Sequence, residues 1–340
     1  MVIVLKNGAH DKDLKRITDV LESKGLKYKL VQGEATRVIC VIGDETKVDM
    51  RAFEGFPGVE RVMPVGMPFK LLSRKGYKKY EHQGTKSVDV NGVKIGGKAP
   101  VIIAGPCAIE SEAQALSVAK SVKEAGADLL RGGAYKPRTS PYEFQGLQEK
   151  GLEILEKMKK ETGLGVVTEV MDPRLVQKVS EVADMLQIGA RNMQNYNLLI
   201  EAGKQKKPVL LKRHPYATLK EWLLAAEYIA AQGNAEIVLC ERGIRSPVSG
   251  EYDRSTLDLN VIPGAKKLTY LPVIVDPSHS TGHRDMVPAA SKGALSFGAD
   301  GLLIEVLRDN ESPTACDYNQ GIFASDFKKL MQEIRAHKYY

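Results

Sequence analysis

The sequence predicts an α/β protein in which a (β/α)8 TIM barrel follows a small ferredoxin-like α+β domain. From residue 100 onward, short apolar strands alternate with helical segments eight times, over about 235 residues. A doubly wound sheet is the alternative, but no GxGxxG or GxxxxGK[ST] loop supports it. Before the barrel, about 65 residues follow the order strand, helix, strand, strand, helix, strand, which is typical of a ferredoxin-like unit.

Composition narrows the class of protein. The chain has 340 residues, of which 43% are hydrophobic and 27% charged, as in ordinary soluble proteins. The net charge of +7 suits an anionic partner. No apolar run approaches the ~18 residues of a membrane span, and the first run is too short for a signal peptide. We therefore expect a cytoplasmic protein that does not bind membranes. The cysteines, Cys40, Cys107, Cys240 and Cys316, are widely spaced, which favours reduced thiols.

The N-terminal domain is assigned to residues 1–67. Its expected helices span 11–24 and 47–54, and its expected strands span 2–6, 27–32, 36–43 and 58–64. Such a domain could bind a small effector, bind RNA or mediate assembly. RNA binding requires aromatic side chains on the central strands for base stacking, and VICVIG has none. We therefore expect no nucleic-acid partner.

The two domains are joined by a basic, glycine-interrupted segment at residues 68–85, which we interpret as a linker with solvated charges. The barrel domain then covers 86–340. Its first feature is SVDVNGVKIGG, in which Asn91-Gly92 predicts a β-hairpin turn ahead of the barrel. The eight predicted barrel strands follow at 101–107, 127–133, 165–170, 183–190, 208–213, 236–243, 272–279 and 301–306.

The ends of these strands carry polar side chains, where a random sample would be mostly small or apolar. In a (β/α)8 barrel the active site lies at the C-terminal ends of the strands. In chain order the predicted strand ends provide Cys107, Arg131, Glu169, Arg191, Lys212, Arg242, His279 and Glu305. The sequence therefore predicts a charged site at this end of the barrel.

A metal site is predicted from three of these positions and one residue of a following loop. Cys107, His279 and Glu305 end strands one, seven and eight, which become neighbours when the barrel closes, and Asp317 lies in the loop after strand eight. Sulfur, nitrogen and oxygen donors suit Zn, Fe, Co or Mn. Each residue alone has a structural explanation, as a small buried residue, a loop histidine or a partner of an arginine. Together at adjacent strand ends they favour a metal.

An anion site is predicted from the cations. Arg131, Lys136, Arg191, Lys212 and Arg242 would surround one barrel mouth, and clustered like charges cost free energy unless anions neutralise them. A solvated surface cluster is a poor alternative for residues that end buried strands.

A second anion site is predicted in KPRTSPY, where Arg138, Thr139 and Ser140 could hold another phosphate, although the segment could equally be a plain turn. Two phosphate sites beside a metal indicate an enzyme that makes or breaks carbon bonds in small phosphates.

The barrel also resembles a known family. IAGPC, LRGGAYKPRTSPYEFQGL, QIGARNMQN, PVLLKR, CERGIR, VDPSHSTGHRD and IEV occur in the order found in 3-deoxy-D-arabino-heptulosonate 7-phosphate (DAHP) synthase of the short type I form. The resemblance covers about 86–335. The first 65 or so residues look like the ferredoxin-like regulatory extension of some members. The resemblance implies a transferase that condenses phosphoenolpyruvate with erythrose 4-phosphate, at the entry to aromatic amino acid synthesis.

The resemblance also implies roles for residues. The ligands of one divalent metal ion would be Cys107, His279, Glu305 and Asp317. Phosphoenolpyruvate would contact Arg131, Lys136, Ala190, Arg191, Lys212 and Arg242, and the sugar phosphate would contact Arg138, Thr139 and Ser140. Lys136 would be the general acid, and we expect Arg131 and Arg138 to depress its pKa. An aromatic amino acid, tyrosine or phenylalanine, would inhibit through the N-terminal domain, and the chain would form a homo-oligomer, a tetramer.

Some positions depart from the family, and other functions compete. Leu307 stands where the family usually has histidine, and the loop from Glu305 to Asp317 differs in length and composition. Cys316 is either an inert thiol or a disulfide partner of Cys107. The closest rival is 3-deoxy-D-manno-octulosonate 8-phosphate synthase, which uses arabinose 5-phosphate and usually has Asn-Arg where this chain has Pro137-Arg138. A protein without catalytic activity that binds phosphate or RNA is the other.

Overall fold

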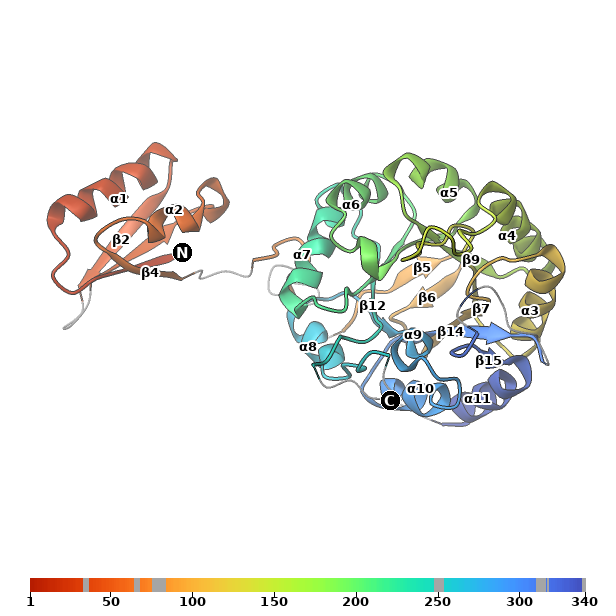
Figure 1. Cartoon of the computed structure of the whole chain (residues 1–340). Helices are drawn as coiled ribbons and strands as arrows, with labels where there is room; N and C mark the ends of the chain where they lie inside the picture. The colour runs from red at the N-terminus through yellow and green to blue at the C-terminus, as the bar shows by residue number, and fades with distance from the viewer. Residues whose placement is uncertain are drawn as a thin grey trace. The chain divides into compact units, whose positions relative to one another are not determined.

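The structure is a computed structural model that describes residues 1–32, 37–63, 68–74, 84–247, 254–309, 316 and 318–337. It divides into two compact units, Met1–Pro68 and Phe69–Tyr340 (Figure 1). Each unit has its own hydrophobic core. Among the described residues, no helix is both long enough and apolar enough to cross a membrane.

The first unit is a four-stranded antiparallel sheet with helices packed on it. Its elements are β1 (Val2–Leu5), α1 (Asp11–Ser23), β2 (Lys27–Gln32), β3 (Arg37–Ile42), the short 3-10 helix η1 (Glu45–Lys47), α2 (Met50–Glu54) and β4 (Val59–Met63), with the sheet order β2-β3-β1-β4. Ile17 and Leu21 lie one helical turn apart on the buried face of α1. They pack in one core with Ile3 and Ile39 of the sheet. The predicted ferredoxin-like order is therefore confirmed.

The second unit is an eight-stranded parallel barrel, as predicted. Its strands are β7 (Val101–Gly105), β8 (Leu129–Arg131), β9 (Gly165–Val170), β10 (Met185–Ile188), β11 (Val209–Lys212), β12 (Ile237–Glu241), β13 (Val273–Val275) and β14 (Gly301–Leu307). Each strand pairs in parallel with the next. β14 also pairs with β7, with Leu302 opposite Ile102, and this pairing closes the barrel.

Helices surround the strands as an outer ring (Figure 1). They are α3 (Glu112–Glu124), α4 (Glu149–Thr162), α5 (Val176–Val182), α6 (Tyr196–Gly203), α7 (Leu219–Ala230), α8 (Val261–Leu268), α10 (Val287–Ser296) and α11 (Ala324–Ala336). Short elements lie in the loops: the 3-10 helices η4 (Pro173–Leu175) and η5 (Ala190–Asn192), the helix α9 (Pro277–Thr281) and the strand β15 (Ile322–Phe323). The short elements η5, α9 and β15 all follow the C-terminal ends of strands.

A hairpin covers the N-terminal end of the barrel. It consists of β5 (Val88–Val90) and β6 (Val93–Ile95), and its turn at Asn91 and Gly92 has positive φ at both residues. Val88, Val90 and Ile95 join the core cluster inside the barrel. Gly165, the first residue of β9, lies so close to Asn91 that an added Cβ would come within 2.8 Å of the Asn91 Cβ. The hairpin therefore packs on the end of the barrel opposite to the C-terminal ends of the strands.

Two of the site residues predicted on strands lie on short helices instead. β13 ends at Val275, and His279 is on α9 because Pro277 starts a helix that the Asp276 side chain caps, accepting the His279 backbone N–H at 2.9 Å. Arg191 similarly lies on η5 rather than at the end of β10. These two strands, β10 and β13, are shorter than the apolar runs suggested.

Residues 69–74, which we interpreted as part of a linker, pack on the barrel. Leu72 is fully buried, and the Glu227 carboxylate of α7 accepts the backbone N–H groups of three successive residues, 70 to 72. The Arg74 guanidinium donates to the backbone carbonyls of Lys266 and Thr269, so this charge is not simply solvated. The rest of the interpreted linker that precedes residue 84 lies outside the described residues.

Candidate active site

Three potential metal ligands meet at the C-terminal end of the barrel. Cys107 follows β7, Glu305 lies on β14 and His279 lies on α9. Their ligand atoms all lie within 4.8 Å of one another, and Cys107 and Glu305 are buried. The register of the closing pair places Glu305 opposite Gly105, two residues before Cys107. A thiol, an imidazole and a carboxylate at this spacing fit a divalent transition metal or zinc.

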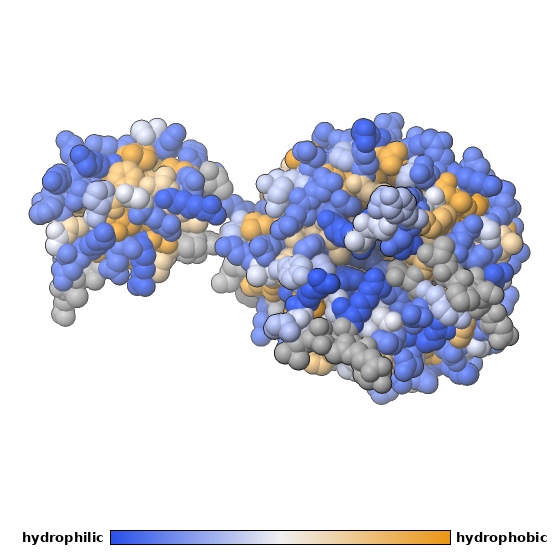
Figure 2. Space-filling view, viewed as in Figure 1, coloured by the Kyte–Doolittle hydropathy of each residue, from blue (hydrophilic) through white to orange (hydrophobic). Residues whose placement is uncertain are grey.

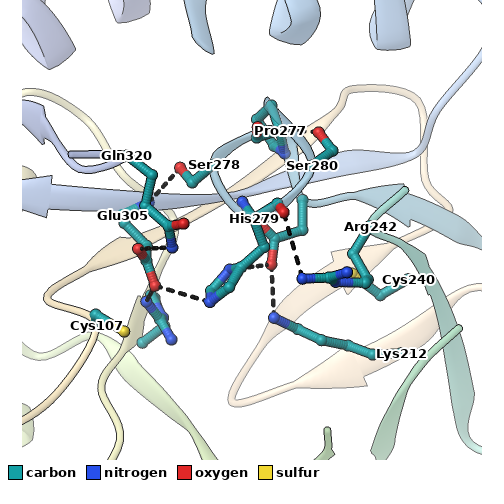
Figure 3. A network of polar contacts seen from close by, with 12 residues as sticks. Cys107, Lys212, Cys240, Arg242, Pro277, Ser278, His279, Ser280, Glu305 and Gln320 are labelled. Carbon is teal, nitrogen blue, oxygen red and sulfur yellow. Dashed lines mark hydrogen bonds and ion pairs between the residues drawn. The ribbon is translucent and has the colours of Figure 1, made fainter. Parts of the chain in front are cut away.

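Glu305 contacts both neighbouring charges of this cluster. Its Oε1 atom lies 2.7 Å from Arg131 Nη1 and 3.2 Å from His279 Nε2 (Figure 3). Arg131 is also buried, and its Nε atom has no hydrogen-bond partner among the described residues. A buried guanidinium N–H without a partner costs free energy, so this group is suited to accept an anion from the cavity.

Asp276 holds the histidine from the other side. Its Oδ2 atom lies 2.7 Å from His279 Nδ1 and 2.5 Å from Lys212 Nζ. Burial alone would raise the pKa of the Asp276 carboxyl, but His279 and Lys212 lower this pKa well below its usual range. An ionised Asp276 therefore faces Nδ1 and leaves Nε2 of the ring directed at Glu305, which is the usual arrangement for a metal-binding histidine.

Lys136 lies directly beside the cysteine. Its ammonium is buried, 3.1 Å from Cys107 Sγ and 3.2 Å from the Cys107 carbonyl oxygen. We expected Arg131 and Arg138 to depress its pKa. Burial and Arg131 do lower this pKa, but the Cys107 and Cys316 sulfurs together with Glu169 outweigh them. The pKa therefore lies above its usual range, and the expected net depression is wrong.

A cavity of about 490 Å³ opens above this cluster. It is lined by most of the predicted substrate-binding residues: Lys136, Arg138, Thr139, Ala190, Arg191, Lys212 and Arg242. Seven of its lining residues are lysine or arginine and only two are glutamate. Strongly hydrophilic residues gather near the centre of this face of the barrel (Figure 2). The arrangement can bind small molecules with several negative charges.

Two of the predicted substrate-binding residues, Arg131 and Ser140, are not among the described residues that line the cavity. Arg131 pairs with Glu305 instead. The Ser140 hydroxyl accepts the Tyr142 backbone N–H at 3.3 Å, as in a turn. Asp317 lies outside the described residues. Leu307, at the position where histidine was expected, is buried at the end of β14, where it pairs with Phe323 and packs on Gly321.

Several residues of the site escaped the sequence analysis. His214, Tyr216, Arg245 and Arg254 also line the cavity. The first three lie two to four residues beyond the ends of β11 and β12, in HPY and GIR, so reading past the strand ends would have found them. Arg254 follows a longer segment, and no local signal indicated it.

The comparisons with known proteins agree with this geometry. The model of the "DAHP synthetase I family" matches residues 79–338, and that of the "DAHP synthase ferredoxin-like domain" matches residues 1–66. The chain belongs to the DAHP synthetase I family. The ferredoxin-like domain has its own family model.

Two relatives are similar over 98% and 74% of the chain. The phospho-2-dehydro-3-deoxyheptonate aldolase of Thermotoga maritima is 44% identical over 335 residues, which are 98% of this chain and 97% of the relative. The crystal structure of that enzyme superimposes with a TM-score of 0.90, over 98% of this chain and 96% of its own. The 2-dehydro-3-deoxyphosphooctonate aldolase of Syntrophotalea carbinolica is 32% identical over 74% of this chain and 95% of the relative.

The two thiols near the cluster generate a prediction. Cys107 Sγ and Cys316 Sγ lie 3.1 Å apart, and both cysteines are buried and neither is in a disulfide. Diamide, which takes two electrons and two protons from a pair of thiols, should therefore crosslink Cys107 to Cys316 in metal-free protein. Peptide mapping by mass spectrometry would detect the crosslink, and bound metal should slow it because Cys107 would be a ligand.

Cys240 provides the control for this experiment. It is a buried free cysteine at the end of β12, and it should not be crosslinked to Cys107. The prediction would be contradicted if Cys107 and Cys316 were both recovered as thiols under conditions in which diamide fully oxidises a reference dithiol.

Proposed function

We propose that the chain catalyses the metal-dependent condensation of phosphoenolpyruvate with erythrose 4-phosphate to give DAHP and phosphate. The observation that carries the proposal is the position of the Cys107, His279 and Glu305 cluster at the base of a cavity whose charged lining residues are mostly cations. This combination serves a reaction of two phosphorylated molecules near a metal ion. The family, and the 44% identity to the Thermotoga maritima aldolase, support the same reaction.

Cys107, His279 and Glu305, with Asp317, would hold one divalent ion, of Mn, Fe, Co or Zn. When bound, the ion would act as a Lewis acid that polarises the aldehyde carbonyl of erythrose 4-phosphate. Asp276 fixes the His279 ring, and Arg131 balances part of the Glu305 charge at 2.7 Å. These contacts would keep the ligands in place before the ion binds.

The cations would position the two substrates. Arg131, Lys136, Ala190, Arg191, Lys212 and Arg242 would bind phosphoenolpyruvate, and Arg138, Thr139 and Ser140 would bind the sugar phosphate. The two groups are adjacent, since Arg191 donates to the Thr139 hydroxyl and the Pro137 carbonyl, each at 3.3 Å. Holding both substrates in this way lowers the entropic cost of bringing the reacting carbons together.

Within this arrangement, C3 of phosphoenolpyruvate forms a bond to the aldehyde carbon. Water adds at C2, and the bond from C2 to the phosphate oxygen breaks to release inorganic phosphate. Lys136 would give a proton to the new hydroxyl or to the leaving phosphate. Its raised pKa keeps Lys136 protonated at neutral pH but also makes the ammonium a weaker acid than an ordinary lysine, so proton transfer would need the developing negative charge of the substrate beside it.

The N-terminal domain would regulate the barrel. We infer that tyrosine or phenylalanine binds to the ferredoxin-like domain and inhibits the enzyme, and that the chain assembles into a homotetramer. A match to a separate ferredoxin-like family model over residues 1–66 supports a distinct role for this domain.

The reaction can be tested by the release of inorganic phosphate. Phosphate should appear from phosphoenolpyruvate with erythrose 4-phosphate, and EDTA should abolish it until a divalent metal is added back. Arabinose 5-phosphate is the control acceptor, which Pro137-Arg138 in place of Asn-Arg disfavours. Faster reaction with arabinose 5-phosphate would favour the octulosonate enzyme instead, and no release with either acceptor would contradict catalysis.

The role of Lys136 can be tested with Lys136→Arg, which keeps the positive charge but does not give up a proton. We expect kcat to fall by about 10² to 10⁴, the usual contribution of a general acid, while KM for phosphoenolpyruvate changes little. Steady-state kinetics would separate the two parameters. Activity within about tenfold of wild type would rule out proton transfer by Lys136.

The regulatory role can be tested by removing residues 1–68, which end at the boundary between the two units. The truncated enzyme should release phosphate in the standard assay but should no longer be inhibited by tyrosine or phenylalanine. Inhibition curves for both amino acids, measured on the full chain and the truncated chain, provide the comparison. Equal inhibition of the two proteins would place the effector site outside the N-terminal unit.

A further inference from the structure

Gln320 lies buried between two charged groups of the site. It is 1% exposed, and its Nε2 atom donates to Glu305 Oε2 at 2.5 Å (Figure 3). On its other side, Gln320 Oε1 accepts a hydrogen bond from Arg254 Nη1. Arg254 lines the cavity. Gln320 therefore connects a residue of the cavity wall to a proposed metal ligand.

The chemistry of the partners fixes the orientation of this amide. An ionised carboxylate only accepts hydrogen bonds, and a guanidinium only donates them. The NH₂ group of Gln320 must therefore face Glu305, and its carbonyl must face Arg254. If the amide turned over, it would direct its carbonyl at the carboxylate and its NH₂ group at the guanidinium, and both contacts would be repulsive.

Glu305 is restrained at both oxygens as a result. Oε1 contacts Arg131 and His279, and Oε2 contacts Gln320. We propose that Gln320 is a positioning residue that holds Oε1 of Glu305 toward Cys107 and His279, and that Arg254 orients Gln320 for this task. The inference rests on the proposed metal site and adds two residues that support it.

The segment that carries Gln320 is itself held firmly. The Arg284 guanidinium lies 4.5 Å from the Tyr318 ring and 4.3 Å from the Phe323 ring, and it donates to the Tyr318 carbonyl at 2.6 Å. The Arg284 backbone N–H donates to the Asn319 carbonyl at 2.9 Å. Because Arg284 follows α9, the chain segment that supplies His279 also fixes the segment that supplies Gln320.

β15 adds a second restraint. It begins two residues after Gln320 and pairs with β14, where Ile322 lies opposite Val306, the residue after Glu305. Gln320 is therefore held at both flanks, and its side chain is positioned before a metal ion binds. Preorganised partners of metal ligands typically contribute about 10 to 100-fold to metal affinity.

If Arg254 acted on the metal directly through its charge, its removal would change the metal affinity in the opposite direction. If Arg254 acted on a bound cation only through repulsion, its removal would tighten metal binding. If Arg254 acts through Gln320, its removal frees the amide to rotate, and metal binding weakens. The sign of the change therefore distinguishes the two effects.

The experiment measures the affinity of the full-length metal-free protein for Mn²⁺ by competition with a fluorescent chelator. Gln320→Met keeps the length of the side chain but removes the donor, and it should raise Kd by about 10 to 100-fold. Arg254→Gln should raise Kd by about three to tenfold. In the double variant, the Arg254 change should have no further effect, because its route through Gln320 is already absent.

Asn234→Leu is the matched control. Asn234 is also a buried carboxamide, donating to the backbone carbonyls of Gln205 and Lys207, but it precedes β12 at the opposite end of the barrel. Its replacement removes buried hydrogen bonds without touching the cluster, so Kd should equal that of wild type. Melting temperatures of all metal-free variants, followed by circular dichroism, show how much stability each loses.

The outcomes separate the inference from the proposed function. A wild-type protein that does not bind Mn²⁺ would refute the proposed metal site. Wild-type binding with Kd unchanged within about twofold in both Gln320→Met and Arg254→Gln, whatever their melting temperatures, would overturn only the role of Gln320. Tighter binding by Arg254→Gln would overturn the coupling. If Gln320→Met does not fold, the direction of the change in Kd for Mn²⁺ in Arg254→Gln tests the inference.

Discussion

The pairing of β14 with β7 is the contact on which the site depends. It joins the last barrel strand to the first, so Glu305 and Cys107, almost 200 positions apart in the chain (305 − 107 = 198), become neighbours. The pairing of β14 with β13 then places His279 beside them. Because parallel strands share one direction, all three side chains reach the same end of the barrel. The hairpin β5–β6 packs against the other end.

Charge at this end is arranged in two layers. The ionised carboxylates Asp276 and Glu305 lie deep, paired with Lys212, Arg131 and His279. Above them, the cavity wall carries seven cations and two glutamates. The excess of positive charge opposes folding, because like charges repel at short range. An anionic ligand would reduce this repulsion. The cations of the cavity wall therefore lower the stability of the free protein and favour the binding of anions.

Short elements in the loops refine the positions that the strands set. α9 turns His279 back toward Glu305, and β15 brings Gln320 to the outer oxygen of the same carboxylate. Arg284 ties these two loops together through two aromatic rings and two backbone carbonyls. The precision of the cluster therefore comes from contacts between loops, while its location comes from the barrel. Leu307 contributes to the same arrangement, because its burial extends β14 to pair with β15.

The sequence by itself determined the barrel, the ferredoxin-like unit and half of the cavity residues, because apolar periodicity and the polar residues at strand ends are local signals. Tertiary structure decided the rest. The docking of 69–74 on α7, the pKa of Lys136 and the place of Gln320 each depend on groups distant in the chain. The order of residues in the sequence does not give the distances between these groups. Both pKa shifts and hydrogen bonds depend steeply on distance, so neither can be inferred without the tertiary structure.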